Sequence, residues 1–335
     1  MKIKENAAPF RHPYGNCISN LLINKLIEEG LPYYPIFAYG FSFEYTPEEG
    51  KALGYCIQSA TPIRSGYWDT IYRVYGLECE FVDKDDNKTV FFDRIERMLQ
   101  TSKVCCLIDC YYDPSTEYAN VYQKVHQGHG RIVTEMDSEF VYYYATHVSD
   151  PAERFCISRD VFYLACEKVL CFKCPETSKS QEELHVVLQA MLHEWFMERD
   201  YQKMIDDLVR FSEAVRESPS LSDEIDHQFR PNRVPVSVLF NRLVLLCQSR
   251  GGVIDFLEGY MNQFGNNAYE QPLQQLKCSL ELWNLVKALL VKYGMAPKQS
   301  LQESMADYLM EISHAEQKAV EGIQKAICDE INISI

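Results

Sequence analysis

Hydrophobic and polar positions follow two different patterns along the chain, and the change occurs near residue 175. Before it, short apolar runs separated by turn residues predict strands mixed with short helices. After it, apolar residues recur every three or four positions, which predicts helices over 181–216, 234–249, 252–263, 271–293 and 299–330. Breaks are expected at Ser218-Pro219, Arg230-Pro231, Gly251-Gly252 and Gly294. We therefore expect two domains, 1–175 and 176–335, joined by a linker over 175–179.

The first domain should open with a helix over residues 17–29. Its apolar positions have helical spacing, Asn16 is a good N-cap residue, and Gly30 is a typical C-terminal stop. The aromatic-rich stretch 31–45 that follows contains prolines and a glycine, and predicts a loop with short strands that forms core packing or lines a pocket. We expect a helix or strand over 66–75, a strand over 77–82 and a helix over 90–99.

Two further patterns predict the centre of a sheet. Residues 104–112 form a nearly continuous apolar run, which is typical of a central strand buried on both faces. Runs over 125–136 and 140–151 flank the acidic turn 137–139 and predict a hairpin. In that hairpin, position 129 faces roughly position 147, and Asp150 falls just past the strand end beside His129.

Composition narrows the class of protein. The chain has 335 residues, of which 47 % are hydrophobic and 24 % charged, so we expect a globular protein with at least one sizeable core. No apolar run reaches the ~18 residues that span a bilayer, and the first residues do not resemble a signal peptide. A cytoplasmic protein without a membrane partner is therefore expected. The net charge of −15 argues against nucleic acid as a partner.

The cysteines are expected to be free thiols in that compartment. One pair, Cys171 and Cys174, has CxxC spacing, but a structural zinc site would need a second pair. We predict no metal site.

Cys17 is the first candidate for chemistry. It lies in the first turn of the helix over 17–29, where unpaired amides and the helix dipole favour a thiolate. A free thiol titrates near ~8.5, and a helix N-terminus with a neighbouring imidazolium lowers this to roughly 3.5–7.5. His129 opens a strand and Asp150 follows the next one, so the chain order is Cys, His, Asp. In that arrangement the imidazole removes or holds the thiol proton and later protonates the leaving group, and the acid orients the ring. A buried structural cysteine is the alternative reading of Cys17.

An oxyanion would also need hydrogen-bond donors. The amide of Cys17 is one natural donor, and His12 or Asn16 are candidates for a second. His126 competes with His129 for the role of base, and His147 lies nearby in sequence. Tyr112 is a further candidate for contact with the substrate.

Several of these residues resemble a known family. The segment 12–17 (His-Pro-Tyr-Gly-Asn-Cys), then 108–112, then 126–129 (His-Gln-Gly-His) and Asp150-Pro151 are similar, in order, to motifs of the butirosin-biosynthesis acyltransferase family. These are papain-like cysteine enzymes related to the bacteriocin-processing peptidases. The resemblance covers roughly residues 10–170. It implies Cys17 as nucleophile, His129 as base and Asp150 as the orienting acid.

The resemblance also implies a fold and an activity. The fold would be α+β, a papain-like cysteine-enzyme domain with a central antiparallel sheet followed by an α-helical second domain. The activity would be amide formation in natural-product biosynthesis, with an acyl group moving from the phosphopantetheine of a carrier protein through acyl-Cys17 to a small-molecule amine, without another cofactor. The alternative is a papain-like hydrolase (peptidase, amidase or thioesterase) with the same triad, and a non-catalytic binding protein of the same fold stays open.

Two expectations about partners follow. An acidic carrier would need a local basic patch on this acidic protein, and the candidates for it are Lys124, Arg131, Arg154 and Arg159. The helical domain could bind the carrier, cover the cleft or form a homodimer.

Overall fold

The computed structural model describes residues 8–58, 67–119, 121–147, 150–173, 179–219, 221 and 237–333. The chain divides into two compact units. Met1–Tyr33 and Trp68–Ser178 form one, here called the sheet unit, and Tyr34–Tyr67 and Lys179–Ile335 form the other, the helical unit. The stretch 34–67, which the sequence pattern placed in the first domain, therefore belongs to the helical unit. In the described part of the chain no helix is both long and apolar enough to cross a membrane.

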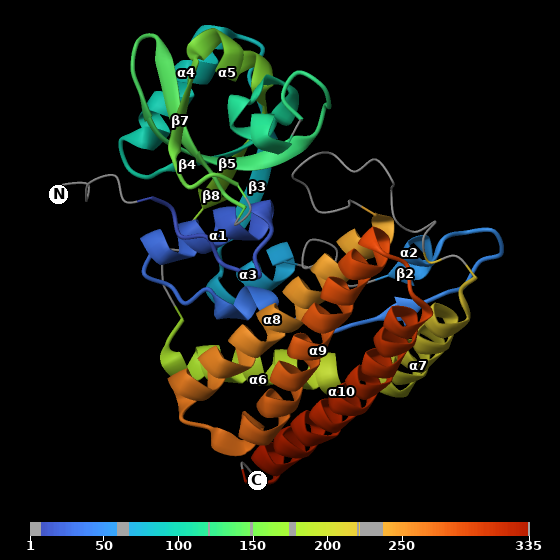
Figure 1. Cartoon of the computed structure of the whole chain (residues 1–335). Helices are drawn as coiled ribbons and strands as arrows, with labels where there is room; N and C mark the ends of the chain where they lie inside the picture. Colours follow the sequence, from blue (N-terminus) through green and yellow to red (C-terminus); the bar gives the residue numbers. More distant parts are fainter. Residues whose placement is uncertain are drawn as a thin grey trace. The chain divides into compact units, whose positions relative to one another are not determined.

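The sheet unit is a mixed α+β structure built on a six-stranded antiparallel sheet (Figure 1). The strand order is β3-β8-β4-β5-β6-β7. The strands are β3 (Glu78–Asp83), β4 (Val104–Asp109), β5 (Gly128–Met136), β6 (Phe140–Ala145), β7 (Arg154–Ser158) and β8 (Cys166–Lys173). The helices are α1 (Cys17–Glu28), α3 (Tyr67–Tyr75), α4 (Lys88–Leu99) and α5 (Arg159–Ala165), with 3₁₀ turns η2 (Cys110–Tyr112) and η3 (Pro114–Ala119).

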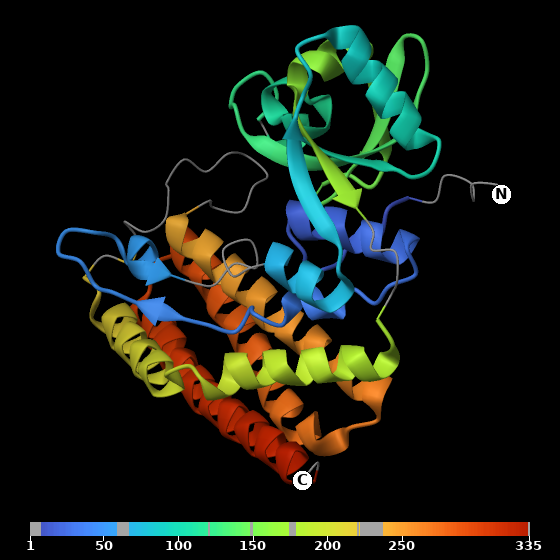
Figure 2. The ribbon, with the colours of Figure 1, turned by 180° about the vertical axis from the view of Figure 1, so that it is seen from behind.

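The central strand β4 is covered on both faces, as its apolar run predicts. Successive residues of a strand point to opposite faces. Cys106 joins a buried cluster with Phe91 of α4 and Phe162 of α5, whereas the thiol of Cys105 lies 3.7 Å from the carbonyl oxygen of Leu21 in α1. Helices α4 and α5 therefore cover one face of the sheet (Figures 1 and 2), and α1 packs against the other.

The predicted hairpin forms from β5 and β6. Arg131 pairs with Ala145 and Ile132 with Tyr144, and a register shift follows between Val133 and Glu135. Extending the first pairs by two residues sets position 129 opposite position 147, and the two imidazole centroids lie 6.4 Å apart. The register therefore agrees with the one that the turn at 137–139 predicts.

The helical unit holds the long helices of the second half of the chain (Figure 2). They are α6 (Gln181–Met197), α7 (Tyr201–Glu217), α8 (Val238–Phe264), α9 (Glu270–Met295) and α10 (Gln299–Ile333), with the 3₁₀ turn η5 (Asn267–Tyr269). Helix α10 packs along α9, α7 and α6, and α9 packs along α8. The earlier stretch adds η1 (Tyr34–Phe37), β1 (Glu44–Tyr45), α2 (Leu53–Cys56) and β2 (Ile57–Gln58), with β1 and β2 paired antiparallel.

The break expected at Gly251-Gly252 is wrong, because α8 runs through both residues. A Cβ atom on Gly252 would lie 2.7 Å from Cδ1 of Phe37, and one on Gly259 would lie 2.3 Å from Cγ of Tyr34. These glycines therefore allow η1 to approach the helix closely and do not end it. The break expected at Arg230-Pro231 lies outside the described residues.

The aromatic stretch 31–45 is largely core. Phe37, Phe41 and Phe43 are almost fully buried. The ring of Phe43 packs in a tilted arrangement against Phe211 of α7 and Trp283 of α9. Of its two interpretations, packing is the one that this burial supports.

The cysteines of the described residues are all free thiols. Cys171 is half-buried in β8, and its CxxC partner Cys174 lies outside the described residues. The expected linker over 175–179 begins in the same undescribed stretch.

Candidate active site

Cys17 is the first residue of α1, as expected. Asn16 caps the helix, because its Oδ1 accepts hydrogen bonds from the amides of Ile18 and Ser19, each at 2.9 Å. The capping oxygen satisfies two amides that the helix itself leaves unpaired. Asn16 is thus engaged in setting the backbone that presents the cysteine.

His12 shapes the turn before the helix. It is 2 % exposed, its Nδ1 accepts from the amide of Tyr14 at 3.2 Å, and its own amide donates to Oδ1 of Asn20 at 2.8 Å. Rings of Phe10, Tyr14 and Tyr33 surround the imidazole, with centroids 5.4–6.0 Å away. These contacts fix the loop that leads to Cys17. The role of His12 as an oxyanion donor stays a prediction.

Cys17 lies at the edge of β5, where the pairing with β6 ends. The last pair is Arg131 with Ala145, and beyond it the amide of Gly130 lies close enough to the Cys17 thiol to act toward a lower pKa of that thiol. The hydroxyl of Thr146 lies 3.0 Å from the carbonyl oxygen of Gly130 and 3.2 Å from that of Cys17. The start of α1 therefore takes the place that a longer β6 would occupy.

Gly130 is needed for this approach. A Cβ atom there would lie 2.8 Å from the carbonyl oxygen of Cys17 and 3.2 Å from Cδ1 of Leu21. Real side chains do not tolerate the first distance, so any other residue would push α1 away from the strand. The close packing of α1 on β5 thus depends on the lack of a side chain at this position.

His129 precedes that glycine, and its imidazole contacts an arginine. Nη1 of Arg131 lies 2.7 Å from Nδ1 of His129 and 2.8 Å from the carbonyl oxygen of Gly130. A guanidinium has only donors, so Nδ1 of His129 is the acceptor.

Asp150 lies beside the same guanidinium. Its Oδ2 is 3.5 Å from Nη1 of Arg131, and it also accepts from the amide of His147 at 3.3 Å. Arg11 donates to the carbonyl oxygens of Asp150 and His147, at 2.7 and 3.4 Å. Asp150 therefore lies where the hairpin register predicts, and Nη1 of Arg131 links it to His129.

A fully buried ion pair supports Arg131. Arg131 and Asp113 are both 0 % exposed, with 2.6 Å between Nη2 and Oδ2 and a second bond from Nε at 2.7 Å. Asp113 also accepts from the hydroxyl of Tyr143 at 2.5 Å, and Arg131 donates to Oγ of Ser115 at 3.2 Å. Charged groups without water need such partners on every side.

Burial governs the protonation of the two central groups. Burial raises the pKa of the Cys17 thiol, although the Gly130 amide and the charge of Arg131 act in the opposite direction. Burial and the charge of Arg131 lower the pKa of His129 to about 4, and the carboxylate of Asp150 only partly offsets them. The resting pair is therefore a neutral thiol and a neutral imidazole at pH 7.

His126 and Tyr112 belong to a separate group at the end of β4. Nδ1 of the exposed His126 lies 2.6 Å from Oδ2 of Asp109, and its ring stacks on Tyr111 with centroids 4.3 Å apart. Burial by itself would raise the pKa of Asp109, but hydrogen bonds from His126 and two amides outweigh it and lower that pKa. Tyr112 packs against the core of the sheet. Their roles toward substrate stay predictions.

The expected basic patch is wrong in one member. Arg131 is fully buried and cannot form part of a surface. Arg154 pairs with Glu135, and Arg159 lies 3.5 Å from Glu96 and over the ring of Phe92. The positive charges of these two arginines are therefore already shared with neighbouring groups.

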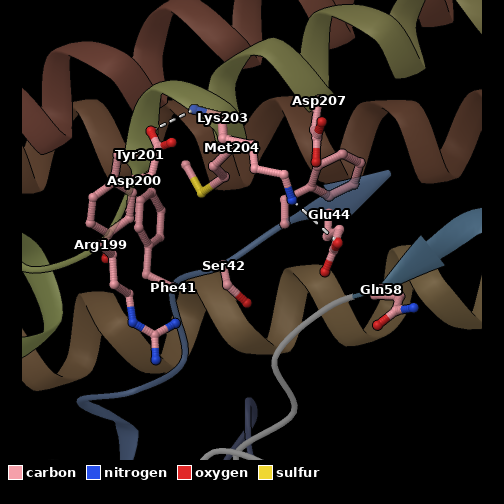
Figure 3. A pocket seen from close by; sticks show the side chains of 11 residues that line it. Phe41, Ser42, Glu44, Gln58, Arg199, Asp200, Tyr201, Lys203, Met204 and Asp207 are labelled. Carbon is pink, nitrogen blue, oxygen red and sulfur yellow. Dashed lines mark hydrogen bonds and ion pairs between the residues drawn. The ribbon is translucent and has the colours of Figure 1, made fainter. Parts of the chain in front are cut away.

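The helical unit contains a cavity of about 390 Å³ between the stretch 41–44 and the start of α7 (Figure 3). Its acids have partners: Oε1 of Glu44 lies 3.3 Å from Nζ of Lys203, Asp200 caps α7, and Asp207 accepts from the amide of Tyr45. The candidate residues 17, 129 and 150 do not line it. Over the described residues, no cluster of three or more His, Cys, Asp or Glu side chains could hold a metal.

The sequence was compared with protein-family models and with curated proteins, and neither comparison finds a match. The class of the protein is thus defined by its structure: an α+β sheet unit, in which Cys17 begins α1 and Arg131 lies between His129 and Asp150, and a helical unit. Sequence reasoning missed the inward role of Arg131 and its partners Asp113 and Tyr143. The available signal was a charged residue within the apolar run 130–133, where a strand buried on both faces is expected.

Proposed function

We propose that the protein is a cysteine-dependent acyltransferase of papain-like architecture. Cys17 would take an acyl group from a carrier-protein thioester and pass it to an amine. The support is a nucleophile at the start of a helix that packs on a sheet, with an imidazole and a carboxylate delivered by the neighbouring hairpin. The resemblance of residues 10–170 to the butirosin-biosynthesis acyltransferases points to the same chemistry.

One observation carries the proposal more than the others. The amides of Gly130 and Ile18 and the charge of Arg131 each act to lower the pKa of the Cys17 thiol at the start of α1, against the larger effect of burial, which raises it. Oriented amides stabilise a thiolate and the oxyanion that forms next to it. Loss of one such donor typically costs ~2.7–4 kcal/mol in the transition state, so the position of this sulfur is suited to covalent catalysis.

The reaction balances without a redox partner. In the first step the sulfur of Cys17 bonds to the thioester carbonyl carbon, the bond from that carbon to the carrier's sulfur breaks, and the thiol proton ends on the carrier's sulfur. In the second step the amine nitrogen bonds to the same carbon, the bond to Cys17 breaks, and one amine proton returns to Cys17. Partial burial of the sulfur limits access of competing water.

The test uses two thioester probes, an octanoyl-charged acyl carrier protein and the octanoyl thioester of N-acetylcysteamine. Intact-mass spectrometry should show one octanoyl adduct on the full-length protein and none on Cys17→Ala. Cys156→Ser is the matched control, because Cys156 is an exposed thiol of the same unit and its loss should leave the adduct intact. An adduct that survives in Cys17→Ala would refute the proposal.

A second arm separates transfer from hydrolysis. An excess of a simple primary amine is added to the preformed adduct, and the products are identified by mass. Octanoyl amide supports acyl transfer. Free octanoic acid in the presence of abundant amine would instead make the protein a hydrolase.

A further inference from the structure

The contact between Arg131 and His129 determines which nitrogen of the imidazole carries a proton. Nη1 of Arg131 lies 2.7 Å from Nδ1 of His129. The guanidinium stays charged and can only donate, so Nδ1 must present its lone pair. A neutral imidazole has one N–H group, and it therefore lies on Nε2.

The guanidinium is held too firmly to be an incidental neighbour. Its Nε and Nη2 bind Asp113, Nη2 also reaches Ser115, and Nη1 binds the carbonyl oxygen of Gly130. Asp113 is in turn held by the hydroxyl of Tyr143. All the atoms of Arg131 are buried, so the direction of Nη1 is set by the core of the sheet unit.

We propose that Arg131 is a positioning residue that fixes His129 as the neutral Nε2–H tautomer, so that the resting ring is a hydrogen-bond donor and not a base. The mechanistic meaning of this inference rests on the proposed acyl transfer, whereas the tautomer itself does not. A neutral imidazole that donates to a developing negative charge is an established catalytic device, as in triosephosphate isomerase. His129 would then be a candidate for the second oxyanion donor beside the amide of Cys17.

The charges around the ring favour the same state. Arg131 faces Nδ1, His147 of the neighbouring strand end lies edge-on at 6.4 Å, and Asp150 supplies the negative charge. A second proton on the ring would have to occupy Nδ1, opposite the guanidinium. A resting thiolate–imidazolium pair between Cys17 and His129 is therefore disfavoured, and the thiol proton has to leave by another route.

The first test needs no variant. Two-dimensional ¹H–¹⁵N correlation spectra of the imidazoles in the full-length protein, assigned with His129→Gln, report the tautomer directly. We expect His129 to carry its proton on Nε2 and to stay neutral at pH 6. A proton on Nδ1, or a ring that is half protonated near pH 6.5, would overturn the inference.

The second test uses Arg131→Lys. A lysine ammonium keeps the buried charge beside Asp113 but cannot also occupy Nδ1 of His129. We expect the fixed tautomer to be lost, and the rate of Cys17 alkylation by iodoacetamide at pH 5.5 to rise at least several-fold because an ion pair with the ring becomes accessible. Arg11→Lys is the control, since Arg11 lies beside Asp150 but binds carbonyl oxygens there.

The outcomes of the two proposals can be told apart. If Arg131→Lys folds and keeps both the Nε2–H tautomer and the alkylation profile of the unmodified protein, the positioning role is refuted. If Arg131→Lys fails to fold, the spectra of the unmodified protein still decide the tautomer. If the tautomer is as stated and no acyl adduct forms on Cys17, the proposed function fails and the positioning of His129 stands.

Discussion

Among the described residues, Arg131 of the sheet unit and Arg250 of the helical unit are both completely buried, and the two arginines are used differently. In the helical unit, Nε and Nη2 of Arg250 each lie 2.8 Å from Glu316, and Nη1 binds the carbonyl oxygen of Ser42 at 2.7 Å. Glu316 also accepts from Ser279 and from the indole of Trp283. In the sheet unit, Nε and Nη2 of Arg131 both bind Oδ2 of Asp113, and Nη1 contacts an imidazole in addition to a backbone oxygen.

The ion pair of Arg250 with Glu316 is structural, whereas the pair of Arg131 with Asp113 also holds a residue of the candidate site. The partners of Arg250 are a carboxylate and a backbone oxygen, neither of which can react further. Among the partners of Arg131 is a titratable ring, that of His129, and the charge of Arg131 also acts on the Cys17 thiol. Buried charge pairs contribute little net stability compared with well-packed apolar residues, so a role in orientation is the better reason for the second one.

The largest expected loss of unfolding free energy comes from breaking the buried ion pair between Arg250 and Glu316. Glu316→Ala leaves the guanidinium of Arg250 buried without its carboxylate, and removing one partner of a buried pair typically costs about 3–5 kcal/mol. Denaturant unfolding of the full chain should show this loss in the transition of the helical unit. The double variant Arg250→Met/Glu316→Leu removes both charges and should recover much of it. A single variant with unchanged stability would show that the pair is solvated.

The next effect is a dependence of stability on pH that comes from His129 of the candidate site. The pKa of His129 is about 4 in the folded protein against 6.5 in a free ring, so the unfolded chain binds more protons below pH 6.5. Stability that is complete above that pH is therefore lost as the pH falls toward 4, by roughly 2–4 kcal/mol over the whole window. His129→Gln should flatten the curve of unfolding free energy against pH between 6.5 and 4.

A control is needed because a second ring contributes with the same sign. Burial also lowers the pKa of His147, although Asp150 acts against it. His147→Gln should therefore flatten the curve less than His129→Gln, and the two effects should combine in the double variant. If His129→Gln and the unmodified protein have equal curves of unfolding free energy against pH, the ring binds its proton as readily in the folded protein as in the unfolded chain.

Much of the sheet unit was predictable because its signals are local. The cap at Asn16, the apolar run of β4 and the hairpin register each depend on neighbouring residues, and the structure agrees with them. Strands β7 and β8 carry no equally clear pattern. The insertion of β8 between β3 and β4 joins segments far apart in sequence, which a local pattern cannot show.

For the candidate site, chain order predicts Cys17, His129 and Asp150 at one edge of the sheet, and their catalytic roles stay predictions. The contact of His129 and Asp150 with Arg131 was not predictable, because the direction of a side chain within a strand depends on register and packing. Arg131 was expected on the surface because isolated arginines usually are. Its burial depends on Asp113, which comes from the turn after β4, and no spacing rule links the two.

The assignment of residues 34–67 failed for a similar reason. This stretch follows α1 directly in sequence, but its buried rings need a larger apolar surface, which α7, α8 and α9 supply. Glycines at the contact, such as Gly252, look like helix breaks in the sequence. They are recognised as contact positions only when the ring of Phe37 is in place.

A smaller effect tests that contact. Gly252→Ala gains at most about 1 kcal/mol of helix propensity, but its Cβ would lie 2.7 Å from Cδ1 of the buried Phe37. Overpacking typically costs about 1–3 kcal/mol, so we expect a net loss of about 1–2 kcal/mol in unfolding free energy. In a double-mutant cycle with Phe37→Leu, the two changes should be less destabilising together than their sum. Strict additivity would show that the ring does not limit the approach.

The smallest expected effect comes from removing the N-terminal cap of α1, which should change both the unfolding free energy and the alkylation rate of Cys17. Asn16→Ala removes the cap of α1 and Asn87→Ala removes the matching cap of α4, which binds the amides of Thr89 and Val90 at 3.0 and 3.2 Å. Each should cost about 1 kcal/mol of unfolding free energy, because caps of this type contribute about 0.5–2 kcal/mol. The alkylation rate of Cys17 should change in Asn16→Ala alone, since only that cap orders the amides around the sulfur. Equal alkylation rates in both variants would show that the first turn of α1 does not tune the thiol, and would leave Gly130 and Arg131 as its principal neighbours.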